Sequence, residues 1–199
     1  MIKSTMGEGL DATVHRLFPF LFWRPLNPNL LSVLGLLVSL GGAALWAQGA
    51  FRPGLILVFL GGFFDLVDGV VARHNGTSSV FGAFLDSTLD RVVDGALMLA
   101  LVLYYAKEDQ FVTAWVAGAA LVAMQLVSYT KARAESVVPD FKGGILERAE
   151  RIVILMFGAL LGLMPLAVAI VAVGSVWTAG QRIAIARQRM AELPFEGPA

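Results

Sequence analysis

The sequence has no cysteine and little charge. Without cysteine among its 199 residues, neither a disulfide framework nor a thiolate metal site can form. Charged residues make up 15% of the chain, whereas a soluble domain carries about 25%. Acidic and basic residues balance at 15 each, which argues against nucleic acid as a partner. With 57% apolar residues, the composition predicts an integral membrane protein.

The N-terminal segment lacks the uninterrupted apolar run of a cleavable signal peptide, because Glu8, Asp11 and His15 interrupt it. Residues 10–23 instead place apolar side chains on one helical stripe, with aromatic residues toward the end. This pattern favours an amphipathic helix lying in the membrane interface. The alternative is a segment that simply leads into the first span.

Six apolar runs follow and predict six transmembrane helices, at about 30–46, 53–72, 82–105, 111–129, 152–164 and 165–177. Most are short for a crossing of about 20 residues, so helices four to six should continue into their polar flanks. That extension would place Arg148, Arg151 and Arg182 on helices. We therefore predict a single all-α membrane domain over residues 1–199, comprising an interfacial helix (1–26), a six-helix core (27–190) and a tail (191–199).

The distribution of positive charge predicts the orientation. Of the fifteen Lys and Arg residues, only Arg52 and Lys107 fall in loops on the side opposite the termini. Because cytoplasmic loops are enriched in Lys and Arg, we expect both termini and any site near the second and fourth loops to face the cytosol. The expected location is the cytoplasmic (inner) membrane.

Four aspartates lie where two apolar runs meet. Asp65 and Asp68 are three residues apart, and Asp86 and Asp90 are four apart, so each pair shares one face of its helix. Ionised carboxylates near lipid are costly unless paired or bound to a cation, which makes them functional candidates. Four hard oxygen ligands suit Mg²⁺ or Mn²⁺ rather than zinc.

Other classes of protein carry acidic residues in membranes. A divalent-cation transporter would distribute its carboxylates across the membrane depth, whereas these four cluster at one interface and spans one, four, five and six have no acid in their central runs. A charged loop without function would not place its acidic residues three or four positions apart on one helix face. Both alternatives are disfavoured.

The spacing D-x2-D-G-x2-A-R-x8-G-x3-D-x3-D resembles the signature of the CDP-alcohol phosphotransferases, membrane enzymes of phospholipid synthesis. The matched residues are Asp65, Asp68, Gly69, Ala72, Arg73, Gly82, Asp86 and Asp90. Intramembrane prenyltransferases also use Asp-x-x-Asp with Mg²⁺ and a diphosphate. The short gap between Asp68 and Asp86 disfavours them, as do Ala72-Arg73 and Gly82.

The resemblance implies the roles of the signature residues. Two Mg²⁺ or Mn²⁺ ions would be held by Asp65, Asp68, Asp86 and Asp90, and Asp90 would also be the general base for the acceptor hydroxyl, or else a ligand only. The CDP-lipid, of CDP-diacylglycerol type, would be bound by Asn29, Asp68, Gly69, Ala72, Arg73 and Gly82. Asn29 belongs to a Pro-Asn-x-x-Ser segment that resembles the family's Pro-Asn-x-x-Thr.

A cationic cluster in the second half of the chain bears on the acceptor. An acceptor with its own phosphate would use Lys and Arg, which bind phosphate well. The segments around Lys131 and Arg151 look most like the branch that makes phosphatidylinositol phosphate, or its archaeal counterpart, from inositol 1-phosphate. That likeness implies an acceptor site of Lys131, Arg133, Arg151 and Arg182, and a homodimer. Glycerol 3-phosphate remains an alternative acceptor, and pairing of Glu147 and Glu150 with Arg148, Arg151 and Lys131 in a cytosolic loop is the purely structural alternative.

Overall fold

The computed structural model describes residues 16, 19 and 26–192, and this part of the chain is helical with no strand. The six helices of the bundle are α2 (Pro28–Trp46), α3 (Phe51–His74), α4 (Val80–Lys107), α5 (Phe111–Glu135), α6 (Arg148–Leu161) and α7 (Met164–Ala191). Apart from residues 16, 19 and 26, the predicted interfacial helix lies outside the described residues, and so does the tail beyond residue 192. The all-α prediction is confirmed for the described core.

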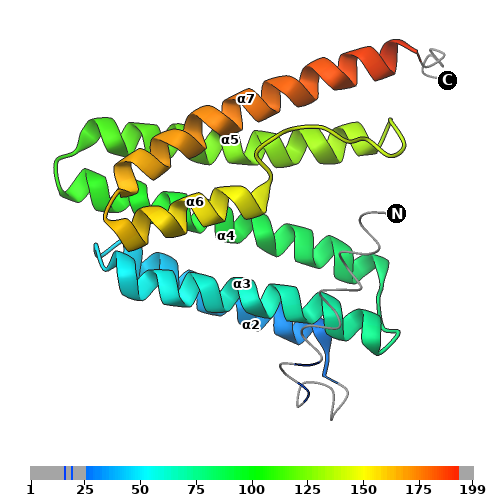
Figure 1. Ribbon diagram of the computed structural model, residues 1–199, viewed down its shortest axis with the longest axis horizontal. Coiled ribbons are helices and arrows are strands. Elements are labelled where there is room, and N and C mark those ends of the chain that lie inside the picture. The colour runs from blue at the N-terminus through cyan, green and yellow to red at the C-terminus, as the bar shows by residue number, and fades with distance from the viewer. Residues whose placement is uncertain (1–15, 17–18, 20–25, 193–199) are drawn as a thin grey trace.

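Successive helices run in alternating directions, so the loops collect at two ends of the bundle (Figure 1). The loops 47–50, 108–110 and 162–163 lie at one end, on the left of the view. The loop 75–79 and the outer part of the segment 136–147 lie at the other. Arg52 and Lys107 sit at the first end, on the termini of α3 and α4. The charge asymmetry seen in the sequence is therefore an asymmetry between the two ends of the bundle.

Four helices of the described chain are long and apolar enough to cross a membrane: α2, α3, α5 and α7. The other two differ for separate reasons. The first 15 residues of α4 include Asp86, Asp90, Arg91 and Asp94. With 14 residues, α6 is about 21 Å long against a hydrocarbon thickness of about 30 Å. The structure thus supports a membrane protein with four candidate spans.

The polar flanks of the apolar runs are helical, as predicted. Helix α5 continues to Glu135 and α7 to Ala191, while α6 begins at Arg148. Gly162, with φ of 72° in the left-handed region, ends α6 and allows the chain to reverse into α7. Arg148, Arg151 and Arg182 are therefore fixed on helices rather than on a loose loop.

Glycines let α2 and α3 pack backbone against backbone. A Cβ atom on Gly35 would lie 3.0 Å from the carbonyl oxygen of Gly61, and one on Gly42 would lie 2.9 Å from that of Gly54. Both distances are shorter than van der Waals contact, so only glycine fits, as in other close helix pairs in membranes. This approach brings the start of α2 against the end of α3, where two of the aspartates lie.

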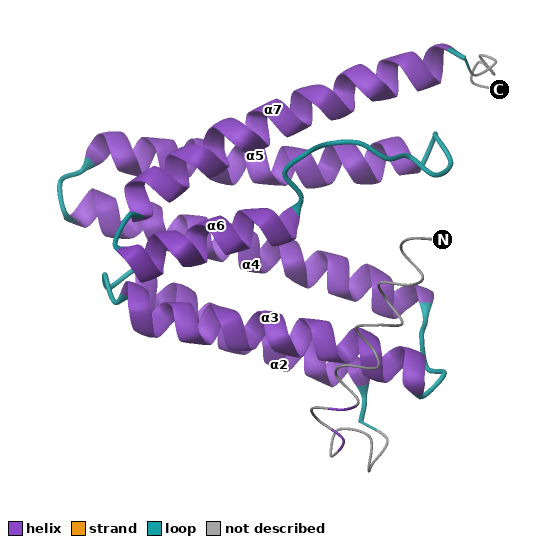
Figure 2. Ribbon diagram, in the orientation of Figure 1, coloured by secondary structure: helices purple, strands orange, loops and turns teal. Residues whose placement is uncertain are grey.

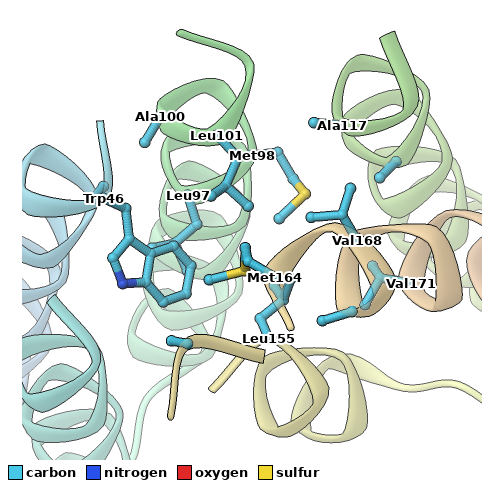
Figure 3. Close-up of a cluster of buried hydrophobic side chains, with 14 of the residues drawn as sticks. Trp46, Leu97, Met98, Ala100, Leu101, Ala117, Leu155, Met164, Val168 and Val171 are labelled. Atoms are coloured by element: carbon cyan, nitrogen blue, oxygen red, sulfur yellow. The ribbon is translucent and has the colours of Figure 1, made fainter. Parts of the chain in front are cut away.

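The buried apolar core joins all six helices, α2 to α7. Figure 3 shows Trp46 of α2 close to Leu97 of α4 and to Met164 of α7, with Leu155 of α6 below Met164 in the view. The Trp46 indole also donates to the Phe51 carbonyl over 3.1 Å. Outside the core, large apolar side chains such as Trp115 (81% exposed) and Val173 (72% exposed) point away from the protein, as expected of a surface that faces lipid.

Candidate active site

Three of the predicted metal ligands converge at one point between α3 and α4. One carboxylate oxygen from each of Asp65, Asp68 and Asp86 lies within 4.8 Å of the others. The helices bring them together because α3 ends and α4 begins on either side of the short loop 75–79. Three carboxylates this close repel one another unless a cation lies between them. Their oxygen donors fit a divalent cation of the Mg²⁺ or Mn²⁺ type.

Asp90 lies one turn further along α4, in different surroundings. Its Oδ1 is 2.8 Å from Nη1 of Arg148, and the same nitrogen is 3.0 Å from Oδ2 of Asp65. Arg148 thus links the carboxylate cluster to the start of α6. The structure places three of the four signature aspartates together and pairs the fourth with an arginine, so a metal-ligand role for Asp90 remains a prediction.

A first cavity, of about 220 Å³, opens beside the cluster. It is lined by Asp68 and Asp86 and by all the residues predicted to bind the CDP-lipid: Asn29, Gly69, Ala72, Arg73 and Gly82. A Cβ atom on Gly82 would lie 3.1 Å from the Ser79 hydroxyl and 3.5 Å from the amide oxygen of Asn29. Glycine at this position therefore keeps the cavity open between α2 and α4.

A second cavity, of about 300 Å³, lies on the other side of Asp90. Its lining includes Asp90 and three of the four residues predicted for the acceptor: Lys131, Arg151 and Arg182. Arg133 is not among them, because its side chain is exposed and donates to the Ser136 hydroxyl over 3.4 Å. The residue two positions after Lys131 points to a different side of α5, as helical geometry requires.

The arginines of the second cavity are buried and held by named partners. Arg151 is 1% exposed, and its Nη2 donates to Oδ2 of Asp94 over 3.1 Å. Its Nε and Nη1 are buried without a hydrogen-bond partner. Arg182 is 3% exposed and donates to the carbonyl oxygens of Gly143 and Val127 over 2.9 and 2.6 Å. Unused donors on a buried guanidinium suit an anionic ligand.

The segment 136–147 helps to position Arg182. In Figure 2 it is the long teal segment that returns from the end of α5 to the start of α6 alongside α7. A Cβ on Gly144 would lie 2.8 Å from Nε of Arg182, and Gly144 has φ of 99°, a conformation that favours glycine. The amide of Leu146 donates to the Thr178 hydroxyl over 3.1 Å. These contacts hold the segment against α7, so that Arg182 and Glu147 both line the second cavity.

The alternative pairing of Glu147 and Glu150 is not what the described residues do. Arg148 and Arg151 pair with aspartates of α3 and α4, and Lys131 approaches Glu135 at 4.0 Å. Glu147 lies 3.9 Å from Arg182 and is itself exposed. Arg148 and Arg151 are therefore paired with aspartates of the bundle, and not with Glu147 or Glu150.

Three residues of the site were not among those predicted. Ser32 donates a hydrogen bond to the Asp68 carboxylate from α2. Arg148 bridges Asp65 and Asp90, and Asp94 pairs with Arg151. Arg148 and Asp94 could have been recognised in the sequence because each is a charged residue within or beside an apolar run, and such residues in membranes are functional candidates by default.

Comparison with known proteins agrees with this geometry. A family model described as CDP-alcohol phosphatidyltransferase matches residues 26–180. A phosphatidylinositol phosphate synthase from Streptomyces avermitilis is 42% identical over 188 residues, which cover 87% of this chain and 77% of that protein.

Two crystal structures of the Mycobacterium tuberculosis phosphatidylinositol phosphate synthase, each 28% identical to this chain, share the fold. The form with CDP-DAG bound has a TM-score of 0.79 and covers 98% of this chain and 100% of that one. The complex with manganese and citrate has a TM-score of 0.77 and covers 96% of this chain and 93% of that one. The chain belongs to the CDP-alcohol phosphatidyltransferase family.

Proposed function

We propose that this protein transfers a phosphatidyl group from CDP-diacylglycerol to inositol 1-phosphate and releases CMP. The observation that carries the proposal is the position of the carboxylates between two cavities. Asp68 and Asp86 line one cavity and Asp90 lines the other, so two substrates can meet at one carboxylate cluster. The Streptomyces relative named for this reaction, and the solved relative with bound CDP-DAG, support the same assignment.

Two divalent cations would bind at the cluster, with Asp65, Asp68 and Asp86 as principal ligands and Asp90 as a shared one. The donor set of three carboxylates within 4.8 Å fits such ions, and the solved relative in complex with manganese supports a divalent metal. When bound, the ions would neutralise the diphosphate and stabilise the leaving CMP.

The first cavity is the site for the cytidine diphosphate group. Gly69 and Gly82 let a planar base approach the helix backbones. The guanidinium of Arg73 can donate two parallel hydrogen bonds to a phosphate. Asn29 and Ser32, from the start of α2, form the opposite wall. The lipid tails then extend into the surrounding membrane.

The transfer is an in-line substitution at the phosphorus of the phosphatidyl group. Asp90 accepts the proton of the acceptor hydroxyl, and the oxygen of that hydroxyl forms a bond to phosphorus. The bond from phosphorus to the oxygen of CMP breaks, and CMP leaves with the electron pair. Asp90 suits this role because it lies at the boundary between the cluster and the second cavity.

The second cavity binds the phosphate of the acceptor. Lys131, Arg151 and Arg182 line it, and Arg151 has two buried donors without a partner. Free inositol brings no anion to those two donors, and a buried donor without a partner costs about 1–3 kcal/mol, so an acceptor with a phosphate is preferred. We leave Arg133 out of this site because it lies outside the cavity.

The same proposal includes the membrane arrangement. All six helices cross or enter the bilayer, and the end of the bundle that holds the site faces the cytosol. The charge asymmetry between the two ends supports this orientation. The second half of α4, which is apolar from Gly95 onward, lies within the bilayer.

The proposal is tested by CMP release from the purified protein with CDP-diacylglycerol and Mg²⁺. Parallel reactions contain inositol 1-phosphate, glycerol 3-phosphate, free inositol or serine, with an EDTA control. We expect metal-dependent release with inositol 1-phosphate and release at least about 100-fold slower with free inositol. Release with glycerol 3-phosphate alone would retain the chemistry and overturn the acceptor. No release with any acceptor would overturn the function.

A further inference from the structure

Asp94 is a buried carboxylate outside the eight-position signature and outside the carboxylate cluster. It lies one turn after Asp90 on α4 and is 3% exposed. Both of its oxygens face arginines: Oδ1 is 3.5 Å from Nε of Arg148, and Oδ2 is 3.1 Å from Nη2 of Arg151. Burying a carboxylate costs desolvation free energy, so the two arginine contacts of Asp94 call for a structural or functional explanation.

Arg148 is also paired with Asp65 and Asp90, whereas Arg151 has no such second carboxylate in the part of the chain that the structure describes. Both arginines occupy the first turn of α6, where the helix dipole disfavours cations. Glu147 precedes the helix without making a side-chain cap, and Glu150 of the same turn is exposed. Among the described residues, Asp94 is the one carboxylate paired with Arg151.

We propose that Asp94 is a positioning residue that holds Arg151 at the acceptor phosphate and Arg148 beside Asp90. One oxygen restrains each arginine. Arg148 is then directed at Asp65 and Asp90, while Nε and Nη1 of Arg151 remain for the phosphate. Asp94 thereby sets the distance between the reacting hydroxyl and the phosphate of the same acceptor. The inference rests on the proposed function, because it needs the second cavity to bind that phosphate.

Positioning and simple electrostatics predict opposite effects of neutralising Asp94. Removal of a negative charge near an anion site should tighten phosphate binding if charge alone mattered. If Asp94 orients the arginines, its loss should weaken phosphate binding, because one guanidinium loses its partner and turns away. The direction of change in acceptor affinity therefore distinguishes the two accounts.

The test uses Asp94→Asn, which keeps the size of the side chain and removes its charge. We expect the KM for inositol 1-phosphate to rise about tenfold or more, while the KM for CDP-diacylglycerol stays within about twofold. Competitive inhibition by inorganic phosphate should weaken in parallel. Glu150→Gln is the matched control, since it removes an exposed carboxylate from the turn that carries both arginines; its kinetic constants should equal those of the wild type.

A double-mutant comparison tests whether Asp94 acts through Arg151. Asp94→Asn combined with Arg151→Gln should raise the acceptor KM no further than Arg151→Gln alone. The double variant also removes both charges of the buried pair, so it should fold even if Asp94→Asn alone does not. A further tenfold rise in the double variant would overturn the proposal.

Two other outcomes would also overturn it. One is a fall or no change in the acceptor KM of Asp94→Asn. The other is an equal rise in both substrate KM values with a lowered Tm, which indicates a purely structural role. A wild-type protein that releases no CMP with any acceptor would instead overturn the proposed function, so the two failures are distinguishable.

Discussion

Two aspartates one turn apart on α4 have different neighbours, and this difference supports the separate roles proposed for them. Asp86 lies with Asp65 and Asp68 beside the first cavity. Asp90 lies against Arg148 and lines the second cavity. The resemblance to the family implies a base role for Asp90 alone, and of these two aspartates the geometry places Asp90 beside the proposed acceptor cavity.

Asp90→Asn tests this assignment, because it keeps the shape of the side chain and removes its capacity to accept a proton. We expect kcat for CMP release to fall at least about 100-fold, with the Kd for CDP-diacylglycerol within about threefold of wild type. Asp86→Asn is the comparison variant and should weaken Mn²⁺ binding. Loss of CDP-lipid binding in Asp90→Asn would favour a ligand role over the base.

The candidate metal ligands and most of the candidate CDP-lipid residues could be picked out from the sequence because they lie within one short segment. All the signature positions fall between Asp65 and Asp90, and the residues assigned there to the CDP-lipid line one cavity. The contact between Arg148 and Asp65 joins residues 83 positions apart, and no local pattern encodes it. Arg133 and Lys131 look equivalent in the sequence, and only the turn of α5 separates them.

At the scale of helices, the apolar runs located every element of the described core but not its ends. The extension of α5 and α7 into polar flanks followed from the length that a crossing requires. The polar stretch between the fourth and fifth apolar runs is helical at both ends, up to Glu135 and from Arg148, and its loop is 136–147. The packing of Gly144 on Arg182 could not be predicted, because the short distance depends on how the loop folds back on α7.

At the scale of the whole molecule, the absence of cysteine makes the orientation directly testable. Asn75→Cys and Glu108→Cys each introduce a single thiol, at exposed positions on opposite ends of the bundle. In intact cells, a membrane-impermeant maleimide should label Glu108→Cys and should reach Asn75→Cys only after the cells are opened. The reverse pattern would contradict the cytosolic site, and labelling of both in intact cells would contradict the bundle as a membrane-crossing unit.

The central claim is that one carboxylate cluster serves two cavities, each for one substrate. The most direct test compares Arg73→Ala, which alters the first cavity, with Lys131→Ala, which alters the second. The account predicts that Arg73→Ala raises the KM for CDP-diacylglycerol by about tenfold or more and that Lys131→Ala does the same for inositol 1-phosphate, each leaving the other KM within about twofold. Equal changes in both KM values for both variants would contradict it.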